Sequence, residues 1–281
     1  MAYLSSQGLV MSLVSEARRP WKLGIALTLL FVMTATFGPL LYAVDPNAQN
    51  LLSVFSPPGA QHPLGTDQLG RDVLARLLHG ARYSAGIAIA VVVFSIALGC
   101  ILAGIAQWSG GMISTSLVMF SDAVYALPGL LVTLLLADVL GGGAMVIVFL
   151  LWIVAWPEYF RLSYSVGQQI VNSDHVLASR LAGASGGTIF RLQVLPVILP
   201  YLLSLGAISV GRIVLAIATL GFLGVGIAPP QAEWGMMIND LRVYWQISPV
   251  QLAAPVFAIV WVVLALLILS QSMPKAKPGL N

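Results

Sequence analysis

Residues 23–44 read LGIALTLLFVMTATFGPLLYAV, an uncharged run bounded by Lys22 and Asp45. A helix needs roughly 20 mostly apolar residues to cross a bilayer, so this run predicts a membrane-spanning helix. The run is longer than the apolar core of a signal peptide, and no small-x-small cleavage site follows it cleanly. These features favour an anchor that the protein retains.

The rest of the chain has the same character. Of its 281 residues, 59% are hydrophobic and 8% are charged, whereas a soluble domain carries about 25% charged residues. A bilayer tolerates an apolar exterior, so the composition predicts an all-α integral membrane protein. The net charge of +3 gives no support for nucleic-acid binding. Cys100, the single cysteine, can form neither an internal disulfide nor a cysteine metal site.

Apolar runs predict about six spans in total. The stretch between Arg82 and Asp122 carries no charge and has room for two of them, divided at the polar residues 107–111. After the first span, the expected spans are 84–106, 112–136 with Asp122 inside it, 142–156 with room to extend to Phe160, 199–226 and 252–270. This division predicts an N-terminal segment 1–22, a transmembrane domain 23–272 and a tail 273–281.

An even number of spans places both termini on the same side of the membrane. Lys and Arg gather on the cytoplasmic side of membrane proteins. With a cytoplasmic N-terminus, the inner segments hold Arg18, Arg19, Lys22, Arg161, Arg180, Arg191, Lys275 and Lys277, against Arg71, Arg76, Arg82 and Arg242 outside. We therefore expect both termini in the cytoplasm. No internal repeat is visible, and so nothing indicates the inverted-repeat plan of many secondary transporters.

The inner loop, about residues 158–195, contains Leu177-Ala178-Ser179-Arg180 and Gly183-Ala184-Ser185. Its pattern predicts a short helix capped by Asp174, a break at Gly183 and a second short helix that leads into the next span. Such an elbow suits a partner's groove. From the residues alone, an amphipathic hairpin lying on the membrane surface is an equal alternative.

This loop resembles the "EAA" loop of bacterial ABC-importer permeases, which reads E-A-A, three residues, G, nine residues, I, one residue, L-P. Leu177-Ala178-Ser179 stands at E-A-A, Gly183 at G, Gln193 at I and Leu195-Pro196 at L-P. The spacing is kept, while Leu177 replaces the glutamate and Gln193 the isoleucine. The resemblance implies that the elbow is the coupling helix that enters a cytoplasmic ATPase. Leu177 has no carboxylate, so it cannot make the polar interaction with the ATPase that the family's glutamate makes.

Further stretches resemble the dipeptide/oligopeptide/nickel branch of the same family. They include 62–72 (HPLGTDQLGRD), 80–84 (GARYS), 221–226 (GFLGVG) and 233–237 (EWGMM), in the family's order. The resemblance covers roughly 45–269 and is closest to the second of the two permease subunits in these importers. The tail departs from the family, because residues 270–277 lack the usual glycine- and aspartate-rich sequence.

The resemblance implies a type I ABC-importer bundle in the bacterial inner membrane. The implied partners are a second permease subunit, two cytoplasmic ATPase subunits, an extracytoplasmic solute-binding protein and membrane lipid. The chain has no G-x-x-x-x-G-K-[ST] phosphate loop, so ATP and Mg²⁺ are expected on the ATPases, with no catalytic residue, metal or cofactor here. The implied substrates are short peptides or nickel and metal chelates.

Arg212 is a charged residue within a predicted span, where insertion costs about 2.5–3.5 kcal/mol. It is a candidate for the translocation path, with Asp122 as a candidate partner. The alternative for Arg212 is a structural ion pair. The alternative for Asp122 is a polar group near the inner end of its span.

Two other functions stay open: a secondary transporter or channel that works without an ATPase, and an intramembrane enzyme. The enzyme would need a nucleophile and a base, or metal ligands, at one depth, which the scattered histidines do not supply.

Overall fold

The computed structural model of the protein describes residues 20–227 and 229–272. Most of the predicted N-terminal segment 1–22 and the whole predicted tail 273–281 lie outside the described residues. The described part is helical, and within it the β-structure consists of one isolated bridge between Thr66 and Asp72. The expected all-α membrane fold is therefore confirmed.

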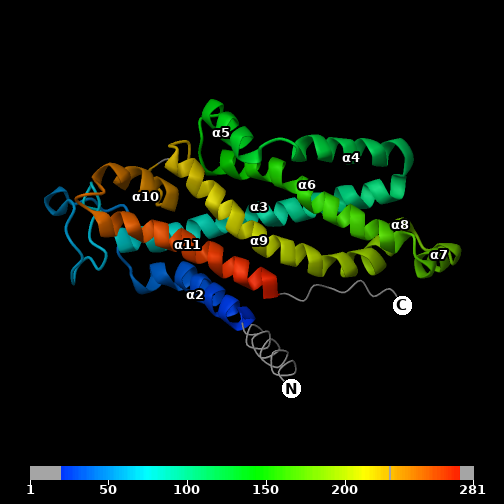
Figure 1. Ribbon diagram of the computed structural model, residues 1–281, viewed down its shortest axis with the longest axis horizontal. Helices are drawn as coiled ribbons and strands as arrows, with labels where there is room; N and C mark the ends of the chain where they lie inside the picture. The colour runs from blue at the N-terminus through cyan, green and yellow to red at the C-terminus, as the bar shows by residue number, and fades with distance from the viewer. Residues whose placement is uncertain (1–19, 228, 273–281) are drawn as a thin grey trace, which may run out of the picture.

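Seven helices build the body of the molecule (Figure 1). Five of them are long and apolar enough to cross a membrane, or six spans result if one bent pair is counted as a single span. They are α2 (Pro20–Leu41), α3 (Val73–Ser109), the bent pair α4 (Gly111–Tyr125) and α5 (Gly129–Val139), α6 (Ala144–Val171), α9 (Leu195–Phe222) and α11 (Pro249–Ser272).

α3 begins well before the predicted start at residue 84. Asp72 caps it, because its carboxylate accepts a hydrogen bond from the backbone N–H of Ala75 at 2.7 Å. Arg76 and Arg82 lie in its first turns, although their charges suggested a loop. The helix thus continues through these charged residues.

The predicted span 112–136 is two helices rather than one. α4 and α5 meet at an angle of 79°, with Ala126, Leu127 and Pro128 between them. Proline lacks an N–H and disfavours helical geometry in the residue before it, which accounts for the break.

α6 is longer than the predicted span 142–156. It continues through Pro157, Glu158 and Arg161 to Val171, so the connection to α9 is shorter than predicted. This connection contains α7 (Asp174–Leu181), α8 (Gly186–Ile189) and a π-helical turn (Phe190–Val194) that runs into α9.

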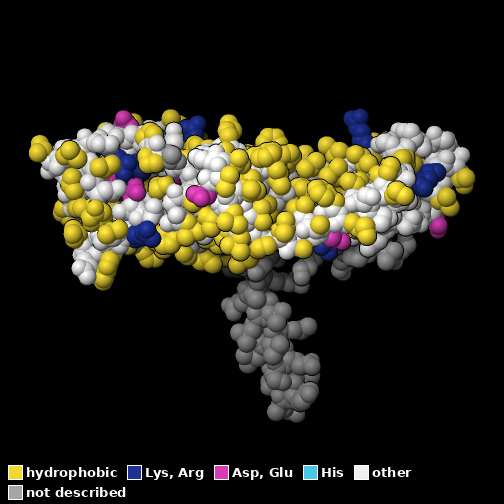
Figure 2. Space-filling view, turned by 90° about the horizontal axis from the view of Figure 1, so that it is seen from above, with side chains coloured by type: hydrophobic (Ala, Val, Ile, Leu, Met, Phe, Trp, Pro, Cys, Tyr) yellow, Lys and Arg dark blue, Asp and Glu magenta, His cyan; other side chains and the backbone are white. Residues whose placement is uncertain are grey.

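Close helix contacts rest on small residues. A Cβ at Gly99 of α3 would meet the backbone N of Phe160 and the Cβ of Tyr159 on α6, each at 2.7 Å. Gln107 of α3 donates to the backbone oxygen of Ser163 on α6 at 3.0 Å. Without a hydrophobic driving force in lipid, such close packing and interhelical hydrogen bonds hold helices together. Large hydrophobic side chains cover much of the outer face instead (Figure 2).

The two ends of the bundle differ. One end carries the loop 42–72 and α10 (Trp234–Leu241), and the opposite end carries α7 and α8 (Figure 1). Loop 42–72 and α10 therefore sit across the length of the bundle from the predicted coupling elbow.

Candidate functional site

The elbow around Gly183 has the geometry that its sequence predicts. Gly183 adopts a φ of +88°, in the left-handed region. Its N–H donates to the carbonyl of Arg180 at 2.9 Å, and the N–H of Ala184 donates to the carbonyl of Ser179 at 3.0 Å. These two bonds form a Schellman motif, which ends α7 and turns the chain towards α8.

The start of α7 differs from the prediction. Ser173 is the N-cap residue, and Asp174 is the first residue of the helix rather than its cap. A carboxylate in the first turn still lies favourably in the field of the helix dipole. Val176 is fully buried and anchors α7 to the bundle.

The outer face of the elbow is exposed and partly apolar. Leu177 and Leu181 are 55% and 82% exposed. The seven predicted coupling residues come together in this elbow: five are exposed (Leu177, Ala178, Arg180, Gly183 and Ser185) and two are half-buried (Ser179 and Ala184). The hydroxyl of Ser185 caps α8.

Three contacts fasten the elbow to its surroundings. The Gln193 side-chain amide donates to the hydroxyl of Ser179 at 2.8 Å, and the Arg180 guanidinium lies 5.1 Å from the centre of the Trp108 ring at the end of α3. Gly186 packs against the same ring so closely that a Cβ there would collide with it. The elbow is thereby joined to both α3 and the π-helical turn that leads into α9.

Arg212 pairs with Glu158 rather than with Asp122. Its Nη2 lies 2.5 Å from Oε2 of Glu158 on α6 and donates to the hydroxyl of Ser209 at 2.7 Å. Asp122 instead lies 3.2 Å from Arg161, one turn along α6 from Glu158. The prediction of Asp122 as the partner of Arg212 was therefore wrong.

The Glu158–Arg212 pair faces a cavity of about 290 Å³. Its walls come from the break between α4 and α5, from α6 and from α9, and are mostly apolar. The side chains of Arg212 and Glu158 are 54% and 27% exposed. Glu158 was not considered as a site residue, because the sequence analysis assigned it to the start of the inner loop. The signal was available, since Glu158 is the only acidic residue between Asp138 and Asp174.

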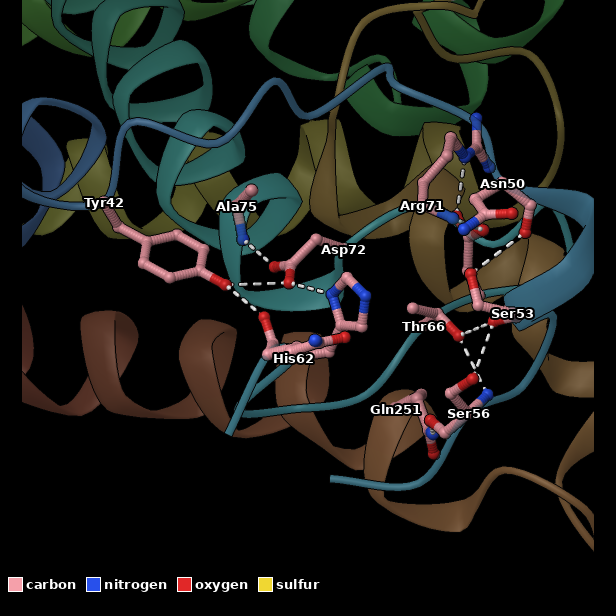
Figure 3. A network of polar contacts seen from close by, with 12 residues as sticks. Tyr42, Asn50, Ser53, Ser56, His62, Thr66, Arg71, Asp72, Ala75 and Gln251 are labelled. Carbon is pink, nitrogen blue, oxygen red and sulfur yellow. Dashed lines mark hydrogen bonds and ion pairs between the residues drawn. The ribbon is translucent and has the colours of Figure 1, made fainter. Parts of the chain in front are cut away.

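The motif 62–72 builds the loop at the other end of the bundle. Asp72 accepts hydrogen bonds from the Tyr42 hydroxyl and from the Ala75 N–H, and it pairs with Nδ1 of His62 at 2.8 Å (Figure 3). Burial, followed by the contact with Asp72, raises the pKa of Tyr42 to about 12. The Thr66 hydroxyl bonds to the backbone of the segment 53–56, so this motif holds the loop together.

A second buried acid caps α10 and packs against α9. The Glu233 carboxylate is fully buried and accepts from the N–H groups of Gly235 and Met236, both at 2.8 Å. Burial raises the pKa of Glu233 to about 7, although these two hydrogen bonds act in the opposite direction. Gly221 of α9 leaves the space that the carboxylate occupies.

The chain matches known proteins over most of its length. Residues 95–276 match the family described as "Binding-protein-dependent transport system inner membrane component". The nickel transport system permease protein NikC of Escherichia coli K12 is 33% identical over 85% of this chain and 87% of its own length. The di/tripeptide transport system permease protein DppC of Pseudomonas aeruginosa is 37% identical over 79% and 75%.

A third relative shows the same likeness. The dipeptide transport system permease protein DppC of Bacillus subtilis is 36% identical over 76% of this chain and 67% of its own length. The family match covers more than half of the chain and includes the elbow, the Glu158–Arg212 pair and α10. The chain therefore belongs to the family of inner-membrane components of binding-protein-dependent transport systems.

Proposed function

We propose that this chain is one of two permease subunits of an ATP-driven importer of short peptides or nickel chelates. The relatives' names supply these substrate classes. Two ATPase subunits on the cytoplasmic side would bind ATP and Mg²⁺, and a solute-binding protein would deliver the substrate outside. The proposal places both termini in the cytoplasm, with residues 1–22 and 273–281 flanking a permease domain at 23–272.

The observation that carries the proposal is the elbow. It is an exposed turn that lies at one end of the bundle (Figure 1), and two of its large apolar side chains, Leu177 and Leu181, are exposed. Burying exposed apolar side chains in a partner is favourable. The contacts from Ser179 and Arg180 to the rest of the chain would carry a movement of the elbow into α3 and α9.

The site residues keep their predicted roles within the proposal. Leu177, Ala178, Ser179, Arg180, Gly183, Ala184 and Ser185 form the coupling elbow. Arg212 and Asp122 line the translocation path, each with its own partner on α6.

Reconstitution tests the proposal. The chain is placed in liposomes with its partner permease, ATPases and binding protein, and uptake of labelled dialanine and of nickel–histidine is measured. We expect uptake of at least one probe only with ATP on the ATPase side and with every subunit present. Uptake by this chain alone without ATP would contradict the proposal and favour a secondary transporter or channel.

A further inference from the structure

The Glu158–Arg212 pair lies deep within the length of the bundle. At 1.5 Å per residue, Glu158 is roughly 21 Å from the start of α6 at Ala144 and a similar distance from its end. Arg212 is roughly 26 Å from the start of α9 at Leu195 and about 15 Å from its end. Both charges therefore lie far from the ends of their helices, in a part of the bundle that is mostly apolar.

At this depth the two charged groups stay paired, because an apolar medium offers neither of them another partner. Each charged group would be costly to leave unpaired in an apolar medium. Ser209 fixes the guanidinium from its own helix. A solute that offers a replacement for each partner can separate the pair without leaving either charge unpaired.

The pair is nevertheless accessible from the cavity, and Arg212 keeps N–H donors for a further contact. Both charged side chains face the cavity of about 290 Å³, which is near the lower end of the usual size of small-ligand sites. Among the contacts of the described residues, both hydrogen bonds of Arg212 leave from Nη2. A guanidinium has five N–H donors in a fork that suits a carboxylate, so Nη1 and Nε can receive one.

We propose that Glu158 and Arg212 form a selective site for zwitterions in the translocation path. The free carboxylate of a short peptide binds Arg212, and its free ammonium group binds Glu158. One intramolecular ion pair is exchanged for two intermolecular pairs, so no charge is left unpaired. This inference rests on the proposed function and decides between its substrate classes in favour of peptides.

The site distinguishes ligands by their termini. A peptide that is acetylated at its amino end leaves Glu158 without a partner, and one that is amidated at its carboxyl end leaves Arg212 without one. A ligand without both charges therefore leaves the Glu158–Arg212 pair closed. Apart from the pair itself, Tyr125 and Ser209 are the polar side chains of the lining, and the other walls are apolar, which fits a site that reads mainly the termini.

The test compares import of three probes by the complete reconstituted importer: dialanine, N-acetyl-dialanine and dialanine amide, with nickel–histidine as a fourth. We expect Arg212→Gln to lower dialanine import at least tenfold while import of dialanine amide stays within twofold of wild type. Glu158→Gln should lower dialanine import equally while import of N-acetyl-dialanine stays within twofold of its wild-type rate. Because the binding protein is the same throughout, the ratio of variant to wild-type import for each probe reports on the permease.

Two further variants guard against loss of folding. The double exchange of Glu158→Arg with Arg212→Glu keeps the ion pair, and we expect it to restore dialanine import to within about threefold of wild type, since a zwitterion can bind in either direction. Arg212→Lys should retain partial discrimination. Arg242→Gln, which removes a cation outside the cavity, is the matched control and should change none of the ratios.

The outcomes separate this inference from the proposed function. If the variants lower import of all probes alike, or if neither the double exchange nor Arg212→Lys restores the preference for dialanine, the zwitterion site is wrong while ATP-driven import stands. Import of nickel–histidine but of no peptide overturns the inference in the same way. If the complete wild-type assembly imports no probe with ATP, the proposed function itself fails.

Discussion

Replacing Gly183 tests whether the shape of the elbow matters for coupling. The glycine has a φ of +88°, and a Cβ built on it would meet nothing within 4 Å. A side chain there would cause no collision, so the effect of a substitution comes from the backbone alone. The left-handed region costs an L-residue about 1–2 kcal/mol, and a β-branched residue is among the least suited to it.

The size of the expected effect follows from that strain. A cost of about 1.4 kcal/mol corresponds to a tenfold change in an equilibrium constant, here between the native elbow and an opened one. Gly183→Val should therefore raise the ratio of opened to native elbow by roughly tenfold and lower ATP-coupled uptake accordingly. Gly183→Asn should stay within about twofold of wild type, because asparagine tolerates left-handed geometry.

The assay is uptake by the reconstituted importer, normalised to the amount of assembled complex. Gly187→Val is the matched control, because Gly187 also has open space around it but lacks a left-handed φ. Uptake by Gly183→Val at the level of the Gly187→Val control would refute the reasoning that the Schellman turn sets the coupling geometry.

Three further predictions concern stability. Gly99→Leu should lower the thermal midpoint of the purified protein, since overpacking costs about 1–3 kcal/mol. Gly86→Leu, on the same helix, points into open space and should leave the midpoint unchanged. Equal midpoints for the two variants would contradict this packing. In a double-mutant cycle, Ser179→Ala and Gln193→Leu should show a coupling of about 0.5–1.5 kcal/mol in the hydrogen-exchange protection of α7, and strict additivity would argue against their hydrogen bond. The folded-state pKa of Glu233 is raised to about 7 above the ordinary 4.5, so its protonation stabilises the fold at low pH, and this contribution is lost as the pH rises through that window. The thermal midpoint should fall from pH 4.5 to pH 7 in wild type and not in Glu233→Gln; parallel curves would contradict the burial of that carboxyl.

Apolar runs predicted the existence of the spans but not their true lengths. The first span was placed at 23–44 and is α2 at Pro20–Leu41. α3 was cut short at Arg82, and α6 was expected to end at residue 156 or at most at Phe160, because charged residues were taken as the ends of helices. Backbone hydrogen bonding continues through these residues, and the cap at Asp72 rather than the first charge decides where α3 begins.

The elbow was largely predictable because its determinants are local. Gly183 and its neighbours specify the turn within a few residues, so pattern and spacing suffice. The partners of Arg212 and Asp122 were not predictable in the same way. Which acid meets Arg212 depends on how α6 and α9 pack, and an expected Arg212–Asp122 pair became two separate pairs along α6.

The most direct test of the account asks on which side of the membrane the elbow lies and what it touches. Leu181→Cys and Val243→Cys, in a Cys100→Ala background, place single thiols at sites 82% and 75% exposed, at opposite ends of the bundle. We expect a membrane-impermeant maleimide to reach Cys at position 181 only from the cytoplasmic side and position 243 only from the outside. A bifunctional cross-linker should join position 181 to an ATPase subunit. Labelling of position 181 from the outside, or cross-linking to the ATPase through position 243 instead, would contradict the account.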